Sequence, residues 1–134
     1  MSYEIDLSFS KALESLFNAG KSVCENVFTG DRPAAVPKQM EEFIVVSIPG
    51  TLESTVCGGG YGNVPTYCNI EIYVRLKKGG SEDIPKMDSI CRSLLEMFPI
   101  SDNTITATRP RLMLKGNDGL GFSASLIRAE LLIK

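Results

Sequence analysis

Apolar and polar residues alternate most regularly between Thr66 and Lys77, near the middle of the chain. The two alternating sets are Ile70, Ile72, Val74 and Leu76 on one side and Asn69, Glu71, Tyr73, Arg75 and Lys77 on the other. A period of two predicts a β-strand with one buried face and one open face. A second run, 43–48, is β-branched and apolar on both sides, which predicts a strand inside the sheet.

Two other segments carry apolar residues at helical spacing, and each follows a residue that can cap a helix. The first stripe, after Asp6 or Ser8, is Phe9, Leu13, Leu16, Phe17 and Gly20. The second, after the possible cap residues of Ser81-Glu-Asp83 and with Pro85 in the first turn, is Ile84, Met87, Ile90, Cys91, Leu94 and Phe98. Residues 21–28 fit both a continuing helix and a strand, and the pattern leaves this open.

The last third of the chain predicts two strands. Residues 104–114 are rich in β-formers around Pro110, which favours an edge strand or a bulge. Asn117-Asp118-Gly119 predicts a turn, and residues 122–134 form the final strand. Ser123 and Ser125 would share its inward face with apolar residues, which suggests a register shift near Leu126.

The predicted order is therefore α-β-β-α-β-β in a single α+β domain, 1–134. We expect a mixed or antiparallel sheet of about four strands with two helices packed on one face.

Residues 51–65 form the longest segment without a regular pattern. Its glycine cluster does not fit a phosphate-binding loop, because the residues after it lead into a strand rather than a helix. Long loops of this kind are often functional, so we expect a mobile assembly loop. Its candidate residues are Cys57, Gly58, Gly59, Gly60, Tyr61, Gly62 and Asn63.

Composition narrows the possible functions. The 134 residues carry a formal net charge of −2 and no histidine. We find no constellation of carboxylates or nucleophiles that points to catalysis, a metal or a cofactor, so we expect none of these and no enzyme. No apolar run reaches the ~18 residues of a membrane helix, and no signal peptide is recognisable, so we expect neither a membrane partner nor secretion from the cytoplasm. The four cysteines lack Cys-x-x-Cys spacing and are expected to be reduced; pairing of Cys57 with Cys68 is not expected.

Charged residues of the predicted strands, together with one tyrosine, are candidates for a subunit interface. They lie on the polar side of the central strand and on the last two strands: Glu71, Tyr73, Arg75, Arg109, Arg111, Arg128 and Glu130. The basic members could face nucleic acid, but no nucleic-acid-binding motif accompanies them, so that partner is not expected.

The segment Asn26-Val-Phe-Thr-Gly-Asp-Arg-Pro33, the second proline at Pro37 and the apolar run 43–48 resemble the tail terminator and tail completion proteins of long-tailed bacteriophages and prophages. The similarity in element order covers nearly the whole chain. The resemblance implies a structural homo-oligomer, commonly a hexameric ring, which is assembled in the host cytoplasm. In the virion tail such a ring caps the tail tube and faces the head connector, and the position of residues 51–65 corresponds to a loop that becomes ordered on assembly.

A second interpretation remains open from the residues alone. A small ferredoxin-like binding module could recognise a ligand or nucleic acid through the same open sheet face.

Overall fold

The computed structural model describes residues 9–49 and 64–134. The cap residues Asp6 and Ser8, and nearly all of the expected mobile loop, lie outside these residues. The elements in chain order are α1 (Phe9–Lys21), β1 (Val27–Thr29), β2 (Glu42–Ser47), β3 (Val64–Arg75), α2 (Ile84–Leu95), β4 (Ile100–Ser101), β5 (Ile105–Asn117) and β6 (Phe122–Ile133).

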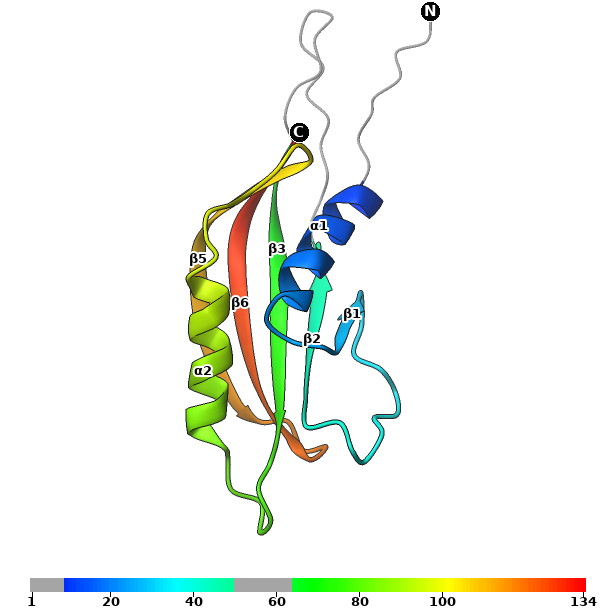
Figure 1. Cartoon of the computed structure of the whole chain (residues 1–134), viewed down its shortest axis with the longest axis vertical. Helices are drawn as coiled ribbons and strands as arrows, with labels where there is room; N and C mark the ends of the chain where they lie inside the picture. Colours follow the sequence, from blue (N-terminus) through cyan, green and yellow to red (C-terminus); the bar gives the residue numbers. More distant parts are fainter. Residues whose placement is uncertain (1–8, 50–63) are drawn as a thin grey trace, which may run out of the picture.

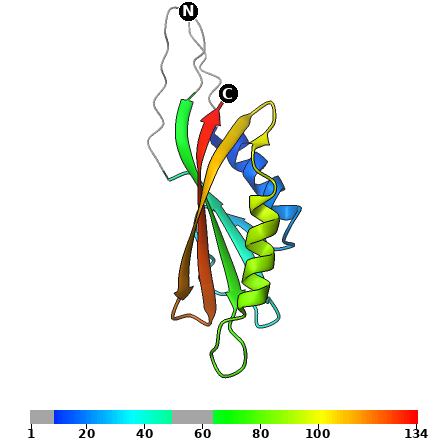
Figure 2. The ribbon, with the colours of Figure 1, turned by 90° about the vertical axis from the view of Figure 1, so that its left-hand side faces the viewer.

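The strands form one six-stranded mixed sheet in the order β1-β2-β3-β6-β5-β4. Only β1 and β2 run parallel; the other neighbours are antiparallel. The sheet curls into a half-barrel with the helices inside its curve (Figures 1 and 2). The predicted fold, a sheet of about four strands with two helices packed on one face, is therefore wrong, because the sheet has six strands and curls around the helices (Figures 1 and 2). It missed β1 and β4, which are only three and two residues long and too short for a periodic pattern.

We call the side of the sheet that carries the helices the inner face and the opposite side the outer face. The main core lies between the inner face and the helices. Its fully buried members include Leu16 of α1, Leu94 of α2 and Ile72 of β3. The apolar side of the alternation in β3 is confirmed, because Ile70, Ile72 and Val74 are all buried, whereas Asn69 on the side expected to be open is buried as well. At about 25 cal/mol per Å² of apolar surface removed from water, this burial is the main term that favours folding.

Strands β3 and β6 form the long centre of the sheet. They pair without interruption through twelve positions, from Val64 with Ile133 to Arg75 with Phe122. The expected register shift near Leu126 is therefore wrong: Ser123 and Ser125 point to the inner face and are buried there. The irregularities lie in β5 instead, between Thr108 and Arg111 and between Leu114 and Gly116. The bulge predicted around Pro110 is thus confirmed.

The segment 21–28, which the pattern left open, is divided between the two structures. Helix α1 ends at Lys21 and β1 begins at Val27. Gly20 lies inside the helix, where a Cβ atom would sit 3.3 Å from a methyl of Val27, so its small size lets α1 approach β1 closely. The run 43–48 does lie inside the sheet, since Phe43–Val46 are buried on both faces.

Helix α2 begins as its sequence predicts. Asp83 caps it, and its carboxylate accepts a hydrogen bond from the Lys86 backbone N–H at 3.3 Å. Ile84 departs from the expected apolar stripe, because 67% of it is exposed. Phe9 of α1 departs similarly, with 57% exposed.

Candidate functional site

The outer face of the sheet is divided into a closed half and an open half. The closed half carries a second, smaller core made by Phe43, Val45 and Phe122. Val36 and Met40, from the connection between β1 and β2, pack against this core. The connection therefore covers part of a face that the alternation in β3 predicts to be open.

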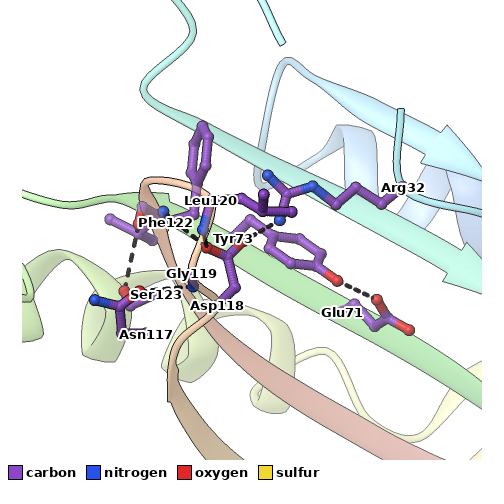
Figure 3. A network of polar contacts seen from close by, with 10 residues as sticks. Arg32, Glu71, Tyr73, Asn117, Asp118, Gly119, Leu120, Phe122 and Ser123 are labelled. Carbon is purple, nitrogen blue, oxygen red and sulfur yellow. Dashed lines mark hydrogen bonds and ion pairs between the residues drawn. The ribbon is translucent and has the colours of Figure 1, made fainter. Parts of the chain in front are cut away.

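Arg32 anchors this connection to the sheet (Figure 3). Its guanidinium lies over three aromatic rings, at 5.6 Å from the centroid of Phe43, 5.0 Å from Tyr73 and 5.3 Å from Phe122. It also forms an ion pair with Asp118 in the turn between β5 and β6. The Arg32 and Asp118 side chains are 20% and 11% exposed, so water screens the pair only weakly.

Asp118 holds the turn and the arginine together. Its Oδ1 accepts hydrogen bonds from the backbone N–H groups of Leu120 and Phe122, at 2.7 and 3.1 Å. Burial alone would raise the pKa of this carboxyl, but these donors and the Arg32 guanidinium outweigh burial and lower the pKa below its ordinary value. The predicted turn at 117–119 is thus confirmed, with a role in the closed half that the sequence did not reveal.

Two residues of the predicted interface, Tyr73 and Arg75, belong to the closed half. The Tyr73 ring stacks on Phe43, and its hydroxyl donates a hydrogen bond to Glu71 at 2.5 Å. Burial and this hydrogen bond to a carboxylate both raise the pKa of Tyr73. Arg75 donates hydrogen bonds to the carbonyl oxygens of Met40 and Pro37, each at 3.0 Å, so it also holds the covering connection.

The open half lies on β3, β6 and β5, beyond the covering connection. Asn69, Arg128 and Arg111 occupy one row across the three strands. Arg128 donates a hydrogen bond from Nε to Asn69 Oδ1 at 3.1 Å, whereas Arg111 stands directly opposite Arg128 in the register. Like charges in this position destabilise an antiparallel pair, so the row is suited to a negatively charged partner.

The next row of the open half carries charges of both signs. Glu130 Oε2 of β6 lies 3.6 Å from Arg109 Nε, and the side chains of Arg109 and Glu130 are 81% and 47% exposed. Arg109 sits in the bulge with a φ of 54°, a left-handed conformation that residues other than glycine adopt rarely. The bulge places the basic side chain of Arg109 near Glu130 and interrupts the pairing of β5 with β6, which resumes at Arg111.

A groove runs along the other side of β5, between that strand and α2. It encloses about 470 Å³. Its apolar walls are formed mainly by Ile84 and Met87 of α2 and by Leu112 and Leu114 of β5, with Glu82, Asp88 and Lys115 at its rim. Leu114 is 74% exposed. Sequence reasoning missed this groove, although three consecutive apolar residues at 112–114 between charged ones signal a strand that is apolar on both faces.

The predicted interface residues are thus brought together in part. Arg109, Arg111, Arg128 and Glu130 lie on β5 and β6 in the open half. Glu71 of β3 instead accepts the hydrogen bond of Tyr73 at the border of the closed half. Tyr73 and Arg75 instead make their contacts within the closed half of the same molecule. The candidate loop residues 57–63 lie outside the described residues.

The three described cysteines, Cys24, Cys68 and Cys91, are buried free thiols. Burial raises the pKa of each, to about 11 for Cys68. Within 9–49 and 64–134, no helix has the length and apolar character needed to cross a membrane.

Comparison with known proteins identifies a related fold and no family. No protein-family model matches the chain, and no curated protein matches its sequence. Among the solved structures that match is one whose name states no function. It superposes with a TM-score of 0.64 and 12% sequence identity, over 99% of this chain and 97% of that chain. At this identity the likeness concerns the fold alone.

Proposed function

We propose that this protein is a structural subunit of a phage or prophage tail. In this proposal it forms a homo-oligomeric ring at the end of the tail tube, at the head-tail junction, and contacts the tube and the head connector. The proposal starts from the resemblance of residues 26–48 to tail terminator and tail completion proteins. It assigns the protein no catalytic role.

The open half of the outer face is the observation that carries the proposal. A ring requires a heterologous contact, in which one patch of a subunit meets a different patch of the next. The open half presents Arg111 and Arg128 beside Glu130, and these exposed charges have no covering element in the described structure. Charge complementarity at such a patch would set the orientation and partner choice of the contact.

Sedimentation velocity of the purified protein across a concentration series, alone and with tail tubes, tests the proposal. We expect one oligomer of fixed size, whose fraction increases with protein concentration. Arg128→Glu should shift the protein toward monomer, because it reverses a charge on the open half. Lys78→Glu is the matched control, since Lys78 is exposed in the turn after β3, away from the outer face. Circular dichroism should show that both variants are folded.

A wild-type protein that stays monomeric at millimolar concentration and with tail tubes would overturn the ring. In that event the open half is better explained as a binding surface of a small module. A labelled oligonucleotide whose binding weakens with salt would support a nucleic-acid ligand at the Arg111–Arg128 pair.

A further inference from the structure

Strand β5 leaves most of one edge unpaired. Strand β4 pairs only with Thr106 and Ala107. Among the described residues, no strand pairs with 109–117 on the side away from β6. An unpaired edge displays a row of backbone N–H and C=O groups, and it accepts an added strand readily.

The unpaired edge has apolar side chains on the inner side. Leu112 and Leu114 are 39% and 74% exposed, and they face Ile84, which is 67% exposed, across the groove. An extended segment added to β5 would place every second side chain into this groove. Those side chains must be apolar to match its walls.

The same edge is basic on the outer side. Arg111 shares the outer face with Arg128, and Arg109 and Lys115 flank it on β5. Two β5 edges paired with each other would oppose arginines and lysines, which disfavours a symmetric β5–β5 dimer. The added strand must instead carry carboxylates between its apolar residues.

Residues 3–7 of this chain have the required pattern: Tyr3-Glu4-Ile5-Asp6-Leu7. Tyr3, Ile5 and Leu7 alternate with the two carboxylates. We propose that residues 3–7 of one copy add as a strand to the β5 edge of a second copy, with the apolar side chains in the α2–β5 groove and the carboxylates beside Arg111 and Arg128. This inference rests on the self-assembly proposed above and names the contact that mediates it.

The contact forms between copies because the segment is too short to reach its own groove. Ile5 lies four residues before Phe9, where α1 begins, which allows a reach of roughly 14 Å. Helix α1 begins toward the end of the molecule where β5 starts, whereas α2 begins at the opposite end (Figures 1 and 2). From Ile105 to Leu112 alone, β5 advances by roughly 23 Å.

Disulfide capture between two single-cysteine-addition variants tests the contact. A tagged Ile5→Cys chain is mixed with an untagged Leu114→Cys chain under oxidised glutathione, so that a mixed product reports a contact between copies. We expect this product to form at least about ten times faster than the product with Asp31→Cys. Asp31 is exposed in the β1–β2 connection and serves as the matched control. Wild-type mixtures correct for the native thiols.

A charge exchange supplies the second readout. Glu4→Lys/Asp6→Lys and Arg111→Glu/Arg128→Glu should each weaken assembly at least about tenfold, and combining the two sets should restore it. Glu25→Lys, an exposed position after α1, should change nothing.

The outcomes separate this contact from the proposed function. Assembly without preferential I5C–L114C capture, or without rescue by the combined charges, overturns the strand addition and leaves the ring standing. Capture in a protein that sediments as a monomer supports the contact but counts against the ring. Equal capture by L114C and D31C overturns the contact whether or not rings form.

Discussion

Loss of the Arg32–Asp118 ion pair should destabilise the subunit by releasing the connection that closes half of the outer face. Asp118→Asn is the sharper of two single changes. The asparagine Oδ1 can still accept the N–H groups of Leu120 and Phe122, which Asp118 accepts at 2.7 and 3.1 Å. Only the charge opposite Arg32 is removed. Arg32→Met keeps an apolar stem over the rings and removes the guanidinium.

The expected magnitude follows from the burial of the pair. Removing one partner of a fully buried pair costs about 3–5 kcal/mol, and this pair is slightly exposed, so we expect about 2–3 kcal/mol for Asp118→Asn. Arg32→Met loses the same pair and the contacts with three rings, and we again expect about 2–3 kcal/mol. The double variant should cost about 3 kcal/mol rather than the sum, because the second change removes an already uncompensated partner. Each single change should lower Tm by roughly 8–10 °C.

Urea unfolding of the four proteins at pH 6 and pH 3 measures the cycle. The folded-state pKa of Asp118 is lowered, so its contribution is complete above the unfolded value near 3.8 and is lost as the pH falls through the folded value. The difference between wild type and Asp118→Asn should therefore shrink at pH 3. Additive single effects, or a difference that grows in acid, would refute the coupling of Arg32 to Asp118.

Three further predictions concern other residues. Absorbance titration should show one tyrosine that ionises well above its ordinary pH range, and this transition should be absent in Tyr73→Phe. Because the pKa of Tyr73 is raised in the folded state, the stability that Tyr73 contributes is lost as the pH rises above about 10. Arg109→Gly should leave the unfolding free energy unchanged or raise it by up to about 1 kcal/mol, whereas Arg109→Val should lower it by about 1–2 kcal/mol, because the φ of 54° at Arg109 strains a branched side chain. Equal effects of the two substitutions in thermal unfolding would contradict backbone strain at Arg109. Native protein should react slowly with a thiol reagent, and denaturation should accelerate the reaction, at three buried cysteines: Cys24, Cys68 and Cys91.

The long elements of this fold follow from local sequence, and the rest does not. Strand β3 and helix α2 each repeat one period over twelve residues, so packing and propensity agree. Strands β1 and β4 lack that repetition, and only pairing with β2 and β5 holds them extended. The sheet therefore has more strands than periodicity could indicate.

The candidate surface shows the same limit. The alternation around Tyr73 predicts which side chains share the outer face, and the register of β3 with β6 adds Arg128 to it. It cannot show that Arg32, some forty residues earlier, returns over Tyr73 and closes part of that face. Contacts between distant segments depend on topology, so the residue pattern of a single strand cannot predict them.

The opposed arginines of the open half lead to a last prediction, in which subunit stability and assembly change in opposite directions. Arg111 and Arg128 face each other, and Asn69 accepts from only one of them. In an isolated subunit this opposition costs stability, so Arg111→Gln should raise the free energy of unfolding by roughly 0.2–1 kcal/mol at low salt.

Salt provides the internal control for this prediction. Added salt screens exposed charges, so it should stabilise wild type more than Arg111→Gln. The unfolding free energies of the two proteins should become equal near 1 M salt, where the Debye length falls to about 3 Å. The same substitution should weaken self-association, because an assembling partner that supplies carboxylates would lose one of its two cationic contacts. Thermal unfolding of dilute subunits across a salt series, beside sedimentation at high concentration, measures both effects. A variant that is less stable at low salt, or that assembles more tightly, would show that the arginine pair is not kept for a negatively charged partner.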